Sequence, residues 1–336
     1  MAETPMCAKV NGSPGRSPDR AVGRLGSRRR VGRVAMATCG VAAPRAVVDV
    51  VLSREQGEGR GARVRRSIGT ARLKHFDPFV MLDEFKVATP AGFPDHPHRG
   101  MTTVTYVLPN AGNGCMEHED SVGNAGMLRP GDLQFMTAGR GILHAEVPEN
   151  ETTCHGLQLW VNLPAKHKMD APEYQELRAS ELREASKDGV RAVVIAGEAF
   201  GAESQIRTKQ APMHYIHFTM SPSSRLVQNV PEGWNCLAYT LRGRADFGRG
   251  EDVDAHNTVT FSNEPGQDGV VVQTTSESAE FVLISGRPND EPIVQHGPFV
   301  MNTREEISQA FADFQGGKNG FESVRGWRSE IQYRTR

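Results

Sequence analysis

Residues 94–100 read PDHPHRG, and residues 141–146 read GILHAE. His96 and His98 are two positions apart in the first stretch. His144 and Glu146 have the same spacing in the second. Along an extended chain, side chains two positions apart project from the same face. If the two stretches are neighbouring strands of one barrel, three imidazoles and one carboxylate converge on a point inside it.

A metal site is the function that these two pairs favour. Three nitrogens and one oxygen suit a first-row divalent metal such as iron, and four protein ligands leave two octahedral positions open for chemistry. One His-x-His pair alone is weak support, because the chain has 11 histidines in 336 residues and such pairs arise by chance. Two pairs of ligand type, each in a strand-like segment, favour a metal site over two unrelated buried pairs.

The rest of the chain, beyond residue 45, reads as many short strands. The predicted strands share β-branched or alternating apolar residues and are bounded by turn residues. They are residues 46–52, 102–108, 157–163, 190–196, 214–220, 236–241, 269–273 and 280–285. Such dense short strands predict antiparallel barrels or sandwiches rather than a parallel sheet covered by helices.

One helix is predicted near the C-terminus. Thr303 and Glu306 form a capping box, and apolar residues recur at helical spacing from Ile307 to Phe314. Gly316 and Gly317 follow and can end the helix. We interpret it as a packing element.

The composition fits a two-domain protein without a membrane span. Its 39 Lys and Arg against 40 Asp and Glu give a formal net charge of −1, which disfavours direct nucleic-acid binding. The apolar runs are far shorter than the roughly 20 residues that cross a bilayer. The five cysteines include no CxxC pair, which fits a reducing compartment. The strands fall into two groups, and we predict domains at 46–178 and 186–332.

Residues 1–45 differ from the rest of the chain. They carry nine basic residues against two acidic ones, with scattered Gly and Pro and no apolar period. This predicts a disordered tail that contributes nothing to the fold. Its Arg-rich, acid-poor character is that of an organellar transit peptide, which would direct the protein to a plastid or mitochondrion. Alternatively, the protein starts at Met36 and is found in the cytoplasm and nucleus.

Two stretches of the sequence closely resemble the signature segments of the pirin family in the cupin superfamily. They are residues 92–100 (GFPDHPHRG) and 130–146 (PGDLQFMTAGRGILHAE), and the resemblance extends from about residue 46 to 330. It implies an all-β bicupin, in which two antiparallel β-barrel (jelly-roll) domains lie face to face, with a short C-terminal helix. It also implies one Fe(2+) per chain in the N-terminal barrel, at the positions of His96, His98, His144 and Glu146.

Two positions depart from the pattern of that family. Thr102 stands where the family commonly has Glu, and Phe135 stands where it commonly has Trp. The Glu ligates metal in many other cupins, whereas pirins take their carboxylate from the second signature. We therefore expect Thr102 to affect the surroundings of the metal ligands more than metal binding itself.

The resemblance implies two alternative functions, and the enzyme is ranked first because all four ligand types are retained. The first is a non-heme iron dioxygenase with quercetin 2,3-dioxygenase activity. It would take a flavonol-like small molecule and dioxygen, with Glu146 as the catalytic proton acceptor. The second is an iron-dependent, redox-sensing transcriptional co-regulator that binds a transcription factor. Under either interpretation we expect a monomer with no membrane association.

Overall fold

Antiparallel strands dominate the computed structural model, which describes residue 41 and residues 43–58, 61–110 and 112–335. Each of the eight segments predicted as strands overlaps an observed strand. The basic tail predicted for residues 1–45 lies mostly outside the described residues. No helix among the residues described is long and apolar enough to cross a membrane.

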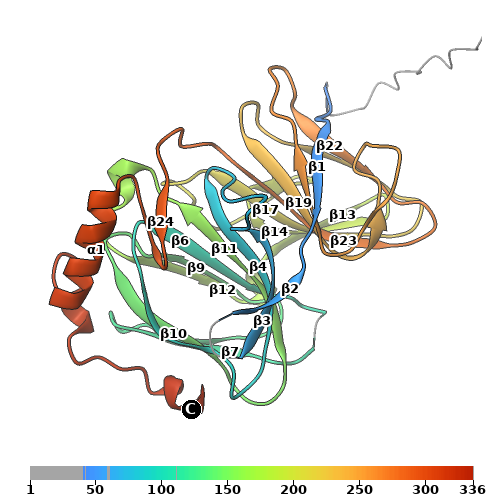
Figure 1. The fold of residues 1–336 in the computed structure, drawn as a ribbon. Helices are drawn as coiled ribbons and strands as arrows, with labels where there is room; N and C mark the ends of the chain where they lie inside the picture. Colours follow the sequence, from blue (N-terminus) through green and yellow to red (C-terminus); the bar gives the residue numbers. More distant parts are fainter. Residues whose placement is uncertain (1–40, 42, 59–60, 111, 336) are drawn as a thin grey trace, which may run out of the picture. The chain divides into compact units, whose positions relative to one another are not determined.

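The N-terminal barrel consists of a seven-stranded sheet facing a four-stranded sheet (Figure 1). The strands of the larger sheet are, in order across it, β12 (Glu173–Leu177), β9 (Leu133–Thr137), β6 (Met101–Val107), β11 (Cys154–Asn162), β4 (Phe79–Val87), β3 (Ala62–Ile68) and β2 (Glu55–Glu58). Those of the smaller sheet are β5 (Phe93–His98), β10 (Ile142–Pro148), β7 (Met116–Asp120) and β8 (Ala125–Leu128). Both predicted ligand pairs therefore lie on the smaller sheet.

The C-terminal barrel is built on an eight-stranded sheet. Its strands are, in order, β1 (Val47–Leu52), β21 (Asn257–Phe261), β19 (Asn235–Ala245), β23 (Ala279–Gly286), β17 (Met213–Met220), β14 (Val190–Ala196) and β13 (Arg183–Lys187), with β20 (Val253–Asp254) paired to β19. The two-stranded sheets are β18 (Arg225–Asn229) with β22 (Gly269–Gln273), β15 (Glu198–Ala199) with β16 (Ala202–Glu203), and β24 (Val294–His296) with β25 (Phe299–Met301).

Helices are few in the described part of the chain. The α-helix α1 (Arg304–Gly316) begins at Thr303, whose side chain accepts from the Glu306 amide in the predicted capping box, and ends at left-handed Gly317. The 3₁₀ turns are η1 (Ala165–His167), η2 (Ala179–Glu181), η3 (Glu322–Val324) and η4 (Ile331–Thr335). The predicted helix is confirmed with its cap.

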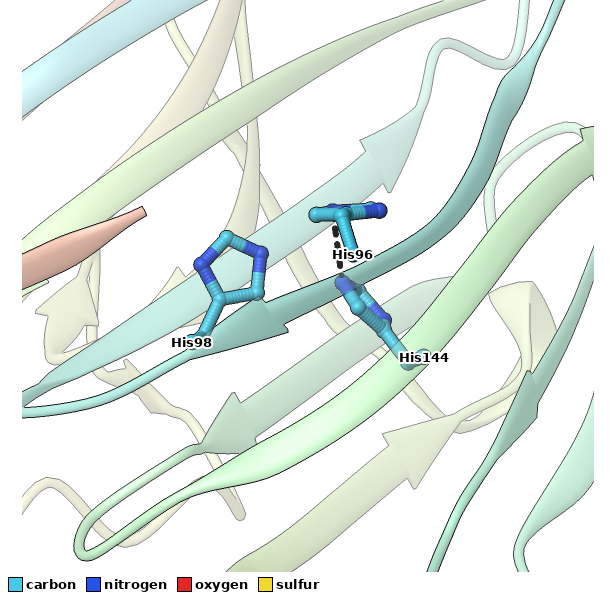
Figure 2. A group of neighbouring side chains, drawn as sticks. All are labelled: His96, His98 and His144. Atoms are coloured by element: carbon cyan, nitrogen blue, oxygen red, sulfur yellow. Dashed lines mark hydrogen bonds between the residues drawn. The ribbon is translucent and has the colours of Figure 1, made fainter. Parts of the chain in front are cut away.

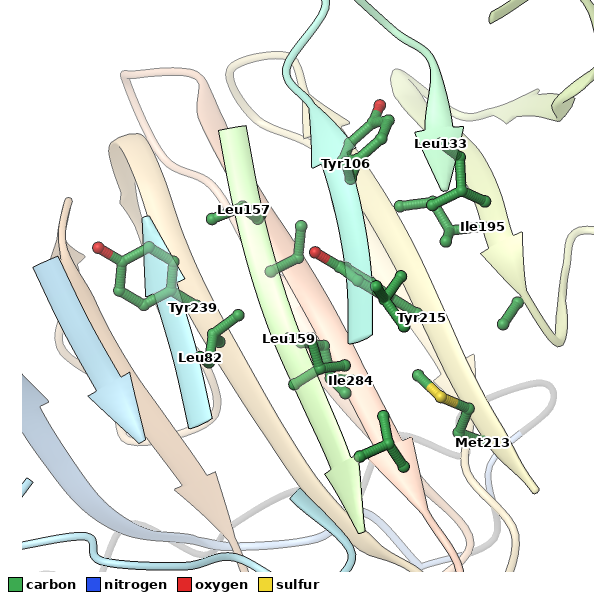
Figure 3. Close-up of a cluster of buried hydrophobic side chains, with 14 of the residues drawn as sticks. Leu82, Tyr106, Leu133, Leu157, Leu159, Ile195, Met213, Tyr215, Tyr239 and Ile284 are labelled. Atoms are coloured by element: carbon green, nitrogen blue, oxygen red, sulfur yellow. The ribbon is translucent and has the colours of Figure 1, made fainter. Parts of the chain in front are cut away.

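The two barrels meet through their large sheets in one shared apolar core (Figure 3). Leu82, Tyr106 and Leu159 of the N-terminal barrel pack in one cluster with Tyr215 and Ile284 of the C-terminal barrel. Because the core takes one face of each large sheet, the other face of the seven-stranded sheet is directed into its own barrel. The expected bicupin with barrels face to face is confirmed.

The predicted division at 46–178 and 186–332 differs from the strand pairing at both ends. Strand β1 pairs with β21 of the C-terminal barrel, although its sequence lies before the N-terminal barrel. Near the other end, Phe299 and Phe321 share a buried cluster with Leu143 of the N-terminal barrel. Each end of the described chain thus packs on the barrel that is farther away in sequence. Strand pairing over such separations has no local sequence signal.

The predicted boundary of the tail at residue 45 is also wrong. Val41 is buried, and the Ala43 amide donates to Asp268 of the C-terminal barrel. The buried Arg45 guanidinium donates to the backbone carbonyls of Trp234, Pro231 and Ser262. The basic composition predicted a disordered tail, but hydrogen bonds from the guanidinium to several carbonyls offset part of the cost of burying this arginine.

We expect Arg45→Ala to destabilise the protein, because it leaves those carbonyls without their donor. The free energy of unfolding should fall by about 2 kcal/mol, measured by urea denaturation. Arg72→Ala is the control: Arg72 forms an exposed ion pair with Asp49, and its loss should cost less than about 1 kcal/mol. Equal effects of the two substitutions would mean that the Arg45 contacts contribute no more than a surface pair.

Candidate metal centre

The two ligand pairs lie on adjacent strands, as predicted. In the antiparallel pairing of β5 with β10, His96 lies directly opposite His144. A bulge then shifts the register between His144 and Glu146, so that Glu146 pairs with Phe93. The alternation of each strand places His98 on the same side as His96. The smaller sheet thus presents all of these side chains to the interior of the barrel.

Three imidazoles form a compact group (Figure 2). The ring centroids of His96, His98 and His144 are 4.3 to 4.9 Å apart, and one ligand nitrogen from each ring lies within 4.8 Å of the others. The Nε2 atoms of His96 and His144 are 2.9 Å apart. This arrangement brings three nitrogen ligands close enough to share one metal ion.

The environment keeps these imidazoles in the form that binds metal. Burial and the neighbouring His96 ring lower the pKa of His98 well below its usual value, and the same two causes act on the pKa of His144. The pKa of His96 is lowered by burial, against the opposing effects of the Pro94 carbonyl and the charge of Glu146. Neutral rings have a free nitrogen lone pair, which a metal ion requires.

A hydrogen bond orients the His96 ring for the same task. Nδ1 of His96 lies 2.8 Å from the Pro94 carbonyl, to which it must donate, so Nε2 carries the lone pair. The buried Nδ1 of His144 and both ring nitrogens of His98 lack hydrogen bonds of good geometry within the described chain. Buried nitrogens left without partners are costly unless something binds them. The three residues therefore fit a transition-metal ion.

Glu146, the fourth predicted ligand, is bound to other groups. It is buried on β10, where Oε1 accepts from the Thr105 hydroxyl at 2.9 Å and Oε2 accepts from the Gln158 amide at 2.7 Å. It remains close enough for its charge to act on His96. The structure therefore brings the three histidines together and holds the carboxylate beside them. Its role as a ligand stays a prediction.

Gln158 and Trp160 were not identified from the sequence as site residues. The Trp160 indole can only donate, and it donates to Oε1 of Gln158 at 3.0 Å, so Nε2 of Gln158 must face Glu146. The Trp160 ring also packs edge-on to His98, with centroids 5.1 Å apart. The sequence signal that could have identified these two residues is the alternation of residue types in 157–163. The residues at every second position there face the barrel interior rather than solvent.

Thr102 does not lie near the metal centre. It pairs with Val161 and Thr137, and its hydroxyl is 3.1 Å from that of Thr137. Val161 belongs to the core between the barrels, so Thr102 faces that core and not the histidines. Phe135 lies in the same core. The expected influence of Thr102 on the ligands is therefore wrong, because residue 102 is on the opposite face of its strand.

The C-terminal segment fixes the end of the first ligand strand. The buried guanidinium of Arg99, next to His98, pairs with Asp313 of α1 at 2.9 Å and lies 4.7 Å from the centroid of the Phe321 ring. At Gly141 a β-carbon would come within 2.7 Å of that same ring, so the turn before β10 requires glycine. The predicted packing helix thus holds the first ligand-bearing segment through Asp313, and Phe321, which follows the helix, packs against the turn before the second.

A cavity of about 660 Å³ adjoins the histidine group. Its lining includes His96, Gln158 and Trp160, and the charged residues Arg66 and Asp83 form an ion pair in its wall. The volume falls within the usual range for small-molecule sites, and the mixture of aromatic and polar lining is typical of them. The histidine group is therefore accessible to a small molecule through His96.

Family models match both halves of the chain. The model for "Pirin" matches residues 61–161, and the model for "Pirin C-terminal cupin domain" matches residues 215–320. The first match contains the three clustered histidines.

Individual relatives match over most of the chain. The chain is 51% identical to pirin of Homo sapiens, with 84% of this chain and 96% of that protein covered. It is 50% identical to a pirin-like protein of Solanum lycopersicum, over 85% of this chain and 97% of that protein. Among solved structures, a quercetin 2,3-dioxygenase from Acinetobacter baumannii is 30% identical, with a TM-score of 0.75, and covers 83% of this chain and 99% of its own.

Proposed function

The chain belongs to the pirin family, and from this premise we propose that it is a non-heme iron dioxygenase with quercetin 2,3-dioxygenase activity. The observation that carries the proposal is the group of three closely spaced imidazoles beside a cavity of small-molecule size. The similarity to a solved quercetin 2,3-dioxygenase supports the substrate class. Flavonols and dioxygen are the proposed substrates.

His96, His98 and His144, with Glu146 as a fourth ligand, would hold one Fe(2+) ion. When bound, the ion supplies Lewis-acid activation of a substrate hydroxyl and of dioxygen at one centre. Imidazole nitrogen also suits nickel, copper and zinc, so iron is the finer part of the proposal.

Glu146 is the proposed proton acceptor for the substrate hydroxyl. Thr105 and Gln158 each donate to one of its oxygens, which fixes the orientation of the carboxyl group. Each carboxylate oxygen has a further lone pair that can accept a proton or contact the metal. Trp160 fixes the orientation of the Gln158 amide. These residues therefore hold Glu146 in place before the substrate enters.

The proposal is tested by purifying the protein without oxygen, loading iron and measuring oxygen uptake with quercetin. We expect uptake that requires both iron and quercetin, together with loss of flavonol absorbance. The control is the His96→Ala variant treated in the same way. Iron bound at one per chain without quercetin-dependent uptake would contradict the dioxygenase.

Gln158→Leu is expected to weaken the site without destroying it. The substitution removes the donor to Oε2 of Glu146, and the loss of such an outer hydrogen bond typically costs at least about tenfold in metal affinity or activity. Titration calorimetry with Co²⁺ measures the affinity. Gln175→Leu is the control, because the Gln175 amide donates to the Arg207 carbonyl outside the site. Equal affinities for the parent and the Gln158 variant would show that Glu146 needs no such support.

The co-regulator interpretation uses the same metal centre. It predicts that iron-loaded protein binds a transcription factor whether or not it consumes quercetin. The oxygen-uptake assay therefore tests the dioxygenase, and binding of a transcription factor by the iron-loaded protein tests the co-regulator.

A further inference from the structure

We propose that Gln134 binds a hydroxyl group deep inside the N-terminal barrel, beyond the three histidines. Gln134 lies on β9, between Leu133 and Phe135, which both belong to the core between the barrels. The alternation of the strand therefore directs Gln134 into the barrel. It is 1% exposed, yet neither its amide nitrogen nor its amide oxygen has a hydrogen-bond partner among the described residues.

The surroundings of this amide follow from the strand register. On its own sheet, Gln134 lies between Thr105 of β6 and Glu176 of β12. On the facing sheet, Glu146 of β10 and His118 of β7 are paired neighbours. The two sheets are joined on either side of Gln134, because Thr105 donates to Glu146 at 2.9 Å and Nε2 of His118 lies 3.1 Å from Glu176. Gln134 therefore faces the space between Glu146 and His118.

The chemistry of this space selects the bound group. An amide needs one partner that accepts from its NH₂ group and one that donates to its carbonyl. The carboxylates of Glu146 and Glu176 repel an anion, and a cation leaves the NH₂ group without an acceptor. Nδ1 of His118 is also buried without a partner in the described chain. A hydroxyl both donates and accepts and carries no charge, so it matches the amide.

Two sources supply such a hydroxyl: a resident water molecule or the substrate. In the register of the seven-stranded sheet, Gln158 of the cavity wall is followed by Thr105 and then by Gln134. Gln134 is two strand spacings from Gln158 in the cavity wall, a distance of about 10 Å. To reach Gln134, a phenolic hydroxyl of a substrate in the cavity must pass the Glu146 carboxylate, to which Gln158 and Thr105 donate. The substrate source rests on the proposed function, whereas the water source does not.

The test compares Gln134→Met with Gln228→Met, in metal-loaded protein, by the melting temperature and by calorimetric binding of quercetin. Gln228 is a matched control, because it is buried and its amide donates to the carbonyls of Glu198 and Asn229. A resident water predicts that both variants melt at a lower temperature than the parent. A substrate hydroxyl predicts an unchanged or higher melting temperature for Gln134→Met and about tenfold weaker quercetin binding.

If the hydroxyl belongs to the substrate, a series of flavonols that each lack one hydroxyl identifies it. Parent and variant should bind equally the flavonol that lacks the hydroxyl bound by Gln134. A rise in the melting temperature of Gln134→Met would overturn the inference if the variant binds quercetin as tightly as the parent, or if the parent itself binds no quercetin. Replacing an unpaired buried amide by an apolar side chain is then enough to explain the gain in stability. Gln134→Leu serves as a second variant if the methionine variant does not fold. If the protein fails to turn over quercetin, this counts against the dioxygenase. The comparison of melting temperatures still tests whether Gln134 binds a hydroxyl.

Discussion

Replacing His96 or His144 by alanine should remove most of the metal from the protein. The parent is expected to bind about one ion per chain, because the described residues form one group of three potential metal ligands. Each substitution removes a nitrogen from that group. Changes around metal ligands already cost about 10–100-fold in affinity, so loss of a ligand should cost more than about a hundredfold. Elemental analysis of protein purified without oxygen measures the occupancy.

His256→Ala is the matched control for these variants. His256 is partly buried and donates from Nδ1 to Glu84 at the contact between the barrels, away from the histidine group. Its loss should leave metal content unchanged. Equal metal loss in all three variants would mean that the site has been misplaced, and a parent stoichiometry near two would mean that a second site exists.

The spacing of residues in the sequence was enough to predict that the three histidines lie together. His96 and His98 are two residues apart on a strand, and so are His144 and Glu146, and the strands carry them on one face as the period of two requires. What spacing cannot supply is the direction in which a carboxylate turns. Glu146 is held by Thr105 and Gln158, and those residues come from two other strands.

The alternating pattern of residues 102–108 shows a further limit. Alternation of polar and apolar residues usually separates solvent from core, but every residue of β6 is buried. Thr105 faces the barrel interior, whereas Val104 and Tyr106 face the second barrel. The sequence predicts the strand and its two faces correctly. That its polar face lines the candidate metal site follows only from the pairing of the barrels.

The ends of the described chain were the least predictable part. Arg45 reads as part of a basic tail, and its burial depends on carbonyls near residues 231, 234 and 262. The contact of Arg99 with Asp313 likewise joins positions more than 200 residues apart. Such contacts depend on the completed fold, which no local pattern encodes.

Glu146→Gln should abolish most of the quercetin turnover while leaving some metal binding. Glutamine keeps the shape and one coordinating oxygen but loses the negative charge, so metal should bind more weakly and remain detectable in excess. It cannot accept a proton at neutral pH. A general base typically contributes about 10²–10⁴-fold, so turnover at matched metal occupancy should fall at least about a hundredfold.

The contacts of Glu146 make this substitution informative. Gln158 and Thr105 both donate to the carboxylate, so the variant must direct an NH₂ group toward one of these donors. Part of any loss therefore reflects positioning, and Gln158→Leu measures that part because it keeps the carboxylate. If both variants lose turnover equally, Glu146 contributes through its position and not through its basicity.

Turnover of Glu146→Gln within a few-fold of the parent would show that the base lies elsewhere or that the substrate arrives already deprotonated. Under the co-regulator interpretation, the iron-loaded variant should still bind its protein partner.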